Sequence, residues 1–180
     1  MPKIVEERSY NGVENKIARL GMSALLDEVR GTITGFELRV MEQKDSNGGA
    51  AIRKLMDARF QGMKGWSKRQ TGAVDWTKCQ TINGTKVCVG VEIQVSARSD
   101  LLVMDIAHLR KEITEGQIDV GVLVVPSDRL GSFLTDRAPR FSDATRHVIQ
   151  ARAEDLPLVI FALEHDGPGD ALAKQPRARS

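Results

Sequence analysis

The chain has 180 residues, enough for one domain with a substantial core, and charged residues make up 28% of it. Because the net charge is only +2, there is no strongly basic field, and any binding of nucleic acid must come from locally arranged Lys and Arg. No apolar run is long enough to cross a bilayer, and the first residues lack the apolar stretch of a signal peptide. We therefore expect a cytoplasmic protein with no membrane partner, folded as a single domain over residues 1–168.

The first third of the chain is predicted to hold two helices and a strand. Apolar side chains recur every three or four positions over residues 11–30 and again over residues 50–60, as in amphipathic helices. Residues 32–41 between them alternate as in a strand. Residues 62–72 then break all periodicity and carry basic side chains around Trp66. This loop either contacts phosphates or is solvated, with the Trp packed into the core.

A tight hairpin is predicted next, because Asn83-Gly84 separates two strand-like segments. If the turn has two residues, Ile82 pairs with Thr85. Counting outward from that pair places the two cysteines, Cys79 and Cys88, opposite each other, and Asp75 opposite Glu92. We expect two thiols, since a reducing compartment keeps cysteines unpaired, and no zinc site, since two sulfurs without a nearby His do not make one.

Downstream, helices alternate with apolar strands. The expected elements are a helix at 101–115, a strand at 118–126, a helix at 142–153 and a strand at 157–163. A strand, helix and strand in succession imply a right-handed crossover between parallel neighbours. The predicted fold is α/β, with a mixed β-sheet in which an antiparallel acidic hairpin is followed by parallel strands, and helices on both faces. The tail, residues 169–180, is rich in Gly, Pro and Arg and is expected to be disordered.

Asp75 and Glu92 are the first candidates for chemistry. In this register they form a non-hydrogen-bonded pair, whose Cβ atoms lie about 4.5–5.5 Å apart. Two carboxylates this close repel each other, and a divalent cation relieves the repulsion by accepting an oxygen from each. Gln94 shares the strand face of Glu92. Alternatively, Glu92 and Gln94 only line the solvated face of an edge hairpin, and a slip of one residue would separate the acids.

An Asp followed on the next strand by Glu-x-Gln is close to the Asp…(Asp/Glu)-x-Lys pattern of a large superfamily of metal-dependent nucleases. More specific segments surround it: Tyr10-Asn11-Gly12-Val13-Glu14, Gly49-Ala50-Ala51-Ile52-Arg53-Lys54, Gly65-Trp66, Val74-Asp75-Trp76-Thr77-Lys78, Val91-Glu92-Ile93-Gln94-Val95, Ile118-Asp119-Val120-Gly121-Val122 with Val125-Pro126, and Leu156-Pro157-Leu158-Val159. Over roughly residues 10–166, these segments resemble the BglII and BstYI family of type II restriction endonucleases.

The resemblance implies a restriction-endonuclease-like fold and a homodimer that cuts both strands of double-stranded DNA at a short palindromic site with Mg²⁺. The family's metal-binding acids match Asp75 and Glu92, which with the backbone carbonyl of Ile93 would hold the cation. Such a cation lowers the pKa of a bound water and offsets charge on the phosphate. The family's Gln matches Gln94, which can only orient a water or phosphate oxygen through its amide. Val95-Ser96 replaces the family's usual Phe-Gly, so the base specificity cannot be carried over.

Residues that could read DNA bases follow the acidic strand and precede the last helix: Ser96, Arg98, Ser99, Arg137, Arg140 and Ser142. The alternative is that Ser99 and Ser142 only cap helices and that the arginines meet phosphates or solvent. Glu14 is a further candidate for a metal or water ligand, unless it simply faces solvent. His108 and His147 fall inside predicted helices, and we expect packing or surface roles for them.

Three functions are compatible with these patterns. The leading hypothesis is a site-specific endonuclease of a restriction-modification system, which would cut plasmid DNA into discrete fragments with Mg²⁺. The second is a sequence-specific DNA-binding protein with a weakened or vestigial nuclease site, because Gln94 replaces a lysine. The third is a repair or junction-resolving nuclease on the same scaffold, which would act only on branched or damaged DNA.

Overall fold

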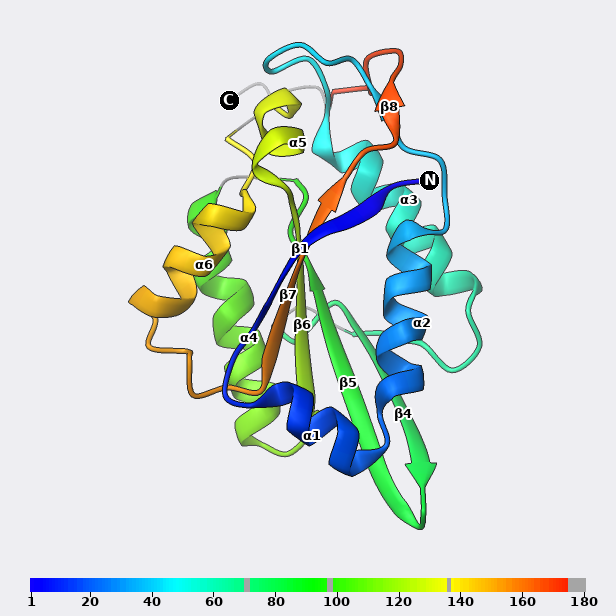
Figure 1. Ribbon diagram of the computed structural model, residues 1–180, viewed down its shortest axis with the longest axis vertical. Helices are drawn as coiled ribbons and strands as arrows, with labels where there is room; N and C mark the ends of the chain where they lie inside the picture. The colour runs from blue at the N-terminus through cyan, green and yellow to red at the C-terminus, as the bar shows by residue number, and fades with distance from the viewer. Residues whose placement is uncertain (70–71, 97–98, 136, 175–180) are drawn as a thin grey trace.

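A six-stranded β-sheet forms the centre of the computed structural model, which describes residues 1–69, 72–96, 99–135 and 137–174 (Figure 1). Its strands run in the order β1 (Lys3–Ser9), β7 (Leu158–Glu164), β6 (Val120–Pro126), β5 (Thr85–Ile93), β4 (Trp76–Ile82) and β3 (Ser67–Lys68). The strands β5, β6 and β7 are parallel, whereas β1, β3 and β4 run antiparallel to their neighbours. The predicted α/β fold with a mixed sheet is therefore confirmed.

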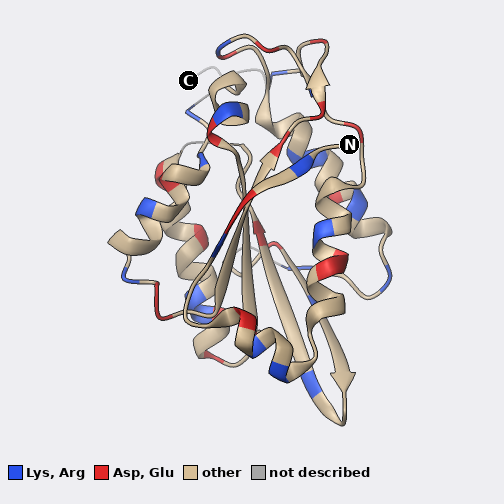
Figure 2. Cartoon of the chain, in the orientation of Figure 1, with Lys and Arg blue, Asp and Glu red and all other residues tan. Residues whose placement is uncertain are grey.

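Helices cover both faces of this sheet (Figure 1). The helices α2 (Ser23–Thr34) and α3 (Gly49–Gly62) lie on one side, and α4 (Leu102–Thr114) and α6 (Phe141–Gln150) on the other, while η1 (Ser99–Leu101) leads into α4 and α5 (Asp128–Phe133) follows β6. The alternation of β5 divides the core, because Val89 and Val91 pack on the α2 and α3 side and Cys88 on the α4 and α6 side. Most charged residues lie on helices and loops (Figure 2).

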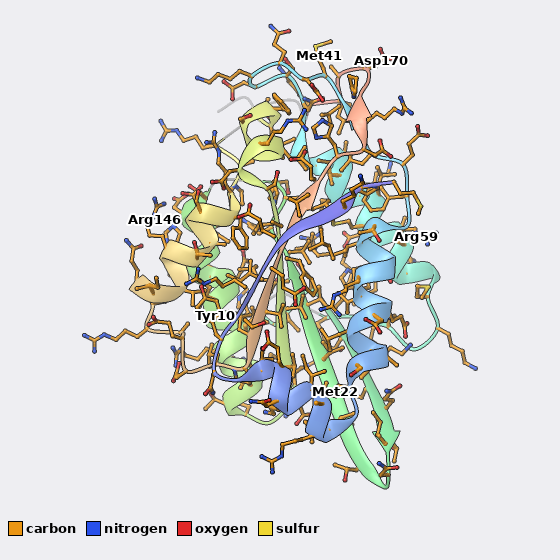
Figure 3. All side chains as sticks on the ribbon, in the orientation of Figure 1. Tyr10, Met22, Met41, Arg59, Arg146 and Asp170 are labelled. Atoms are coloured by element: carbon orange, nitrogen blue, oxygen red, sulfur yellow. A yellow bond between two sulfur atoms is a disulfide. The ribbon has the colours of Figure 1, made fainter. Side chains whose placement is uncertain are left out.

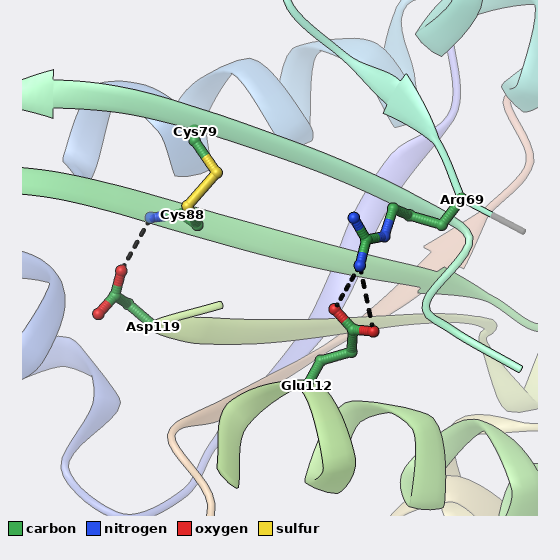
Figure 4. Close-up of a disulfide and its surroundings, with 5 residues drawn as sticks. All are labelled: Arg69, Cys79, Cys88, Glu112 and Asp119. Atoms are coloured by element: carbon green, nitrogen blue, oxygen red, sulfur yellow. Dashed lines mark hydrogen bonds and ion pairs between the residues drawn. A yellow bond between two sulfur atoms is a disulfide. The ribbon is translucent and has the colours of Figure 1, made fainter. Parts of the chain in front are cut away.

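The β4–β5 hairpin has the predicted register. Asn83 and Gly84 have φ angles of 51° and 80°, as a type I′ turn requires, and Ile82 pairs with Thr85. The prediction of two thiols is wrong: Cys79 and Cys88 form a disulfide (Figure 4). That prediction came from the expected compartment, whereas the pairing brings the two Cα atoms to 4.1 Å.

Two contacts fix the hairpin and its neighbours on the α4 side (Figure 4). The backbone N–H of Cys88 donates to the Asp119 carboxylate at 2.8 Å, just before β6. Arg69, directly after β3, pairs with the buried Glu112 of α4 at 3.2 Å. These links hold strand and helix together next to the site described below.

The N-terminal third departs from the prediction. The helix expected at 11–30 is two helices, α1 (Val13–Leu20) and α2, separated at Gly21, whose φ of 69° ends the first. Met22, in this junction, is fully buried, while Arg59 and Arg146 project outward from opposite flanks (Figure 3). The edge strand β1 was not predicted, because most of its residues are exposed and polar.

The strand predicted at 32–41 is wrong over most of its length. The helix α2 continues to Thr34 because Val29 and Ile33, four residues apart, are both buried on one helix face. Only β2 (Arg39–Val40) is extended, and it pairs in parallel with β8 (Gly167–Pro168) in a separate two-stranded sheet.

Part of the tail expected to be disordered lies within the described residues. Leu172 accepts a hydrogen bond from the Gly48 N–H and donates one to the Asn47 side chain, both at 3.1 Å. Residues 175–180 lie outside the described part of the chain. Among the described residues, no helix is both long and apolar enough to span a membrane.

Candidate active site

The open end of the β4–β5 hairpin, opposite the turn, carries both predicted acids. The last ladder pair joins Trp76 and Val91, so Asp75 and Glu92 are the next residues on the two strands. The Asp75 Oδ2 atom accepts a hydrogen bond of 2.8 Å from the backbone N–H of Ile93. This contact holds the Asp75 carboxylate against the end of β5.

Arg53 of α3 binds two of the three atoms that were predicted to hold a cation. Its Nη2 donates to Asp75 Oδ1 at 2.5 Å and its Nη1 to the carbonyl oxygen of Ile93 at 2.8 Å. Its Nε donates to Asp57 at 3.2 Å. Burial lowers the pKa of Arg53, but the neighbouring Asp75 and Asp57 outweigh it, so the pKa rises and the guanidinium stays charged.

Asp57 in turn fixes Arg53. It accepts hydrogen bonds from the Trp76 indole at 2.8 Å and from Lys68 at 2.9 Å. Burial raises the pKa of Asp57, but these two hydrogen bonds and the charge of Arg53 hold it below its usual range. A chain of charges, from Lys68 through Asp57 and Arg53 to Asp75, therefore ends at the site.

Glu92 is in a different environment from Asp75. It is buried, and its Oε1 lies 3.0 Å from Nδ1 of His108 on α4. Burial raises the pKa of Glu92 to about 11, and the charges of Asp75 and Asp105 add to this effect. Among the described residues, no Lys or Arg forms an ion pair with Glu92.

Asp105, one helical turn before His108, completes the cluster. Burial, followed by the charge of Asp75, raises the pKa of Asp105 to about 7. Its Oδ2 is buried and has no hydrogen-bond partner in the described part of the chain. Glu92, Asp105 and His108 each offer a ligand atom, and these atoms lie within 4.8 Å of one another, in a geometry that could hold a metal ion.

Three of these residues were missed by the sequence reasoning. Arg53 lay in a family-like segment but had no role assigned, and Asp105 was not considered. His108 was expected to be a packing or surface residue, and its ring lies 3.0 Å from the carboxyl group of Glu92. The available signal was the spacing of three between Asp105 and His108, which places both on one helix face directly after the acidic strand.

The remaining predicted residues are distributed as follows. Gln94 is buried just after β5, and its backbone N–H donates to the Val124 carbonyl of β6 at 2.8 Å. Two lysines of the hairpin could in principle supply the charge that Gln94 lacks, but Lys78 binds Glu28 at 2.7 Å and Lys86 is exposed near the hairpin turn. Glu14 is exposed on α1, at the other end of the sheet from the C-terminal end of β5 (Figure 1).

The described candidates for reading bases come from two segments that touch each other, one after β5 and one leading into α6. The N–H of Ser99 donates to the carbonyl of Arg137 at 3.1 Å, so the segment after β5 meets the segment before α6. Arg137 and Arg140 are exposed, and Ser96 is half-buried. Arg98 lies outside the described residues. Ser99 and Ser142 do not cap helices, because the N-cap positions of α4 and α6 are Leu101 and Arg140.

Comparison with known families gives a match over most of the chain. The model of the family described as restriction endonuclease BglII/BglIII matches residues 5–163. The chain belongs to this family. No curated protein sequence matches it.

As a BglII/BglIII family member, the protein is a type II restriction endonuclease, a nuclease of a restriction-modification system that acts on DNA. Restriction endonucleases of this kind depend on a metal ion, and Glu92, Asp105 and His108 form a group that could hold one. The resemblance found in the sequence is thus confirmed.

Proposed function

We propose that this BglII-type enzyme acts in the cytoplasm as a homodimer and uses Mg²⁺ to hydrolyse both strands of double-stranded DNA at a short palindromic sequence. One observation carries the proposal. The hairpin register makes Asp75 and Glu92 the next residues after its last ladder pair, and the Asp75 carboxylate and the carbonyl oxygen of Ile93 both accept hydrogen bonds from Arg53. These are hard oxygen donors of the kind that Mg²⁺ prefers.

The electrostatics of the site fit a bound cation. Burial disfavours the charged forms of Glu92 and Asp105, and the negative charge of Asp75 adds to this effect in both. When bound, Mg²⁺ supplies positive charge at the phosphate and lowers the pKa of a water. Asp75, Glu92 and the Ile93 carbonyl are the residues that would hold it.

Arg53 and Gln94 have complementary positioning roles. Arg53 orients Asp75 and the Ile93 carbonyl through two separate N–H groups, and it supplies the fixed positive charge that Gln94 lacks. The neutral amide of Gln94 can donate to a phosphate oxygen and accept from a water, so it orients these groups without titrating.

For sequence recognition we infer roles for six residues from the segment after β5 and the segment leading into α6: Ser96, Arg98, Ser99, Arg137, Arg140 and Ser142. The hydrogen bond between Ser99 and Arg137 supports this inference, because it joins the two segments beyond the end of β5. Arginines in such segments can contact guanine in the major groove.

Exposed apolar side chains support the homodimer. Leu101, Val103 and Met104, at the start of α4, are 44%, 48% and 54% exposed, and Ile149 of the adjoining α6 is 53% exposed. A second copy would remove such a surface from water. We expect Met104→Glu to convert the dimer to a monomer in analytical ultracentrifugation, whereas Met41→Glu, at an exposed methionine outside these helices, leaves the dimer intact.

Digestion of a plasmid of known sequence with Mg²⁺, followed by mapping of the ends, tests the function. We expect discrete fragments, with every cut lying within the same short palindromic sequence. The cleavage rate should be at least about 10³-fold lower in Asp75→Asn and Glu92→Gln. Glu37→Gln makes the same chemical change at a glutamate that is 73% exposed, and this variant should cut like the original. Random degradation, or tight binding to duplex DNA without cutting, contradicts the proposal.

A further inference from the structure

The carboxyl groups of the site differ in whether they have a cationic partner. Asp75 is paired with Arg53 and hydrogen-bonded to the Ile93 N–H, so both of its oxygens have partners. Glu92 and Asp105 have no Lys or Arg partner among the described residues, and one oxygen of Asp105 is buried without a hydrogen bond. The carboxyl groups without a cationic partner therefore lie on the α4 side of β5 and not beside Asp75.

The donors on that side suit a metal ion of a particular kind. Their ligand atoms lie within 4.8 Å of one another, a little more than the roughly 3–4.2 Å that separates atoms bound to one ion at about 2.1 Å, so small side-chain shifts would close the site around an ion. Two carboxylates and one imidazole form a mixed oxygen and nitrogen set. Imidazole suits transition metals and zinc, whereas Mg²⁺ prefers oxygen ligands and retains its waters.

We propose that Glu92, Asp105 and His108 form a second cation position, filled in the DNA-free protein by an ion that accepts imidazole, such as Mn²⁺, in preference to Mg²⁺. The position shares Glu92 with the Mg²⁺ position proposed above, and it rests on the proposed function only in that shared ligand. Arg53 occupies the Asp75 side when DNA is absent, so the α4 side is the one open to an ion.

The three histidines of the chain provide a direct test. Mn²⁺ is paramagnetic and broadens the NMR signals of nearby protons, so we expect substoichiometric Mn²⁺ to broaden the ring signals of His108 first. His165 is a matched control, because it also contacts two carboxylates, Glu42 and Glu164, but Arg129 pairs with both of these. His147 is a second control, and His108→Gln assigns the signal.

Electron paramagnetic resonance of free Mn²⁺ then counts the ions bound by the DNA-free chain. We expect one tight ion, bound at least about tenfold more weakly in Asp105→Asn and His108→Gln, with a much smaller loss in Asp75→Asn. Unchanged His147 and His165 signals show that each variant is folded. Equal broadening of all three histidines, or displacement of Mn²⁺ by an equal concentration of Mg²⁺, overturns the proposal. So does a loss of binding in Asp75→Asn that Asp105→Asn does not share.

The plasmid assay separates this inference from the proposed function. Cleavage with Mg²⁺ without Mn²⁺ binding at His108 overturns the second position alone. Mn²⁺ bound at His108 without any cleavage supports the second position and contradicts the proposed function.

Discussion

The two ends of the β4–β5 hairpin obey the same ladder but have opposite surroundings. At the turn, Thr85 and Lys86 are exposed, and polar groups there remain in water. At the open end, Trp76 and Val91 are buried and the next residues are the acids Asp75 and Glu92. A register set by Asn83-Gly84 in solvent thus determines which carboxylates meet inside the protein.

This difference separates stability from function. At the turn, polar groups remain hydrated, so their position costs little free energy of folding. Near the open end, carboxyl groups are buried, which disfavours their ionised forms. Such groups destabilise the folded state but are suited to binding a cation. Changes at the open end should therefore alter catalysis strongly, and changes toward the turn should alter only stability.

Outside the two acids themselves, the largest effect is expected from Arg53→Ala. Loss of the guanidinium leaves Asp75 and the Ile93 carbonyl without the partner that orients them, so we expect kcat to fall about 100-fold with little change in KM for DNA. Arg53→Lys keeps the charge but cannot bridge Asp75 and the Ile93 carbonyl in the same way. Its rate should lie between those of the original protein and Arg53→Ala. Arg59→Ala, on the exposed face of the same helix, is the control. A change in KM alone would contradict a positioning role.

Glu92→Gln should stabilise the metal-free protein. The pKa of Glu92 is about 11 in the folded state against 4.5 in the unfolded chain, so between these values only the folded state keeps the proton. The free energy of unfolding therefore falls as pH rises above 4.5, by up to about 1.4 kcal/mol per pH unit for one group. We expect Glu92→Gln to be more stable by about 2 kcal/mol at pH 8 and to depend less on pH.

Urea unfolding in EDTA from pH 5 to pH 9 measures this difference. Glu37→Gln, at the exposed position, should follow the original protein at every pH. If the free energy of unfolding depends on pH equally in Glu92→Gln and in the original protein, the burial of Glu92 is not the cause of that pH dependence.

Removal of the disulfide should have a smaller effect, confined to stability. Cys79 and Cys88 lie between the turn and the acids, and ladder pairs continue on both sides of them. We expect Cys79→Ser with Cys88→Ser to lower the free energy of unfolding by about 2 kcal/mol and to leave the cleavage rate within about twofold. A large loss of cleavage would show that the cross-link, and not the turn, sets the register.

The hairpin shows which parts of the fold were readable from sequence. The register could be predicted from Asn83-Gly84, because a type I′ turn imposes a local backbone requirement. The apolar runs of β6 and β7 predicted strands covered on both faces. The strand β1 and the end of α2 were not readable, since packing against β7 and the core decides them.

The site divides in the same way. Asp75 and Glu92 could be paired by counting residues, because they belong to one hairpin. Arg53, Asp105 and His108 come from helices on opposite faces of the sheet, and no local sequence pattern determines where along a strand each helix packs. Their part in the site depends on tertiary packing and became visible only in the structure.

The smallest effect should come from Gly84→Ala at the turn. The φ of Gly84 is 80°, a region that costs an L-residue about 1 kcal/mol, and an added Cβ would meet no atom within 4 Å. The loss is therefore pure backbone strain. Gly31→Ala in α2 is the matched control, because its Cβ also meets open space but its φ is ordinary, so this change should stabilise by up to about 1 kcal/mol. Opposite signs for the two variants in thermal unfolding, with unchanged cleavage in both, would confine the role of the turn to setting the register.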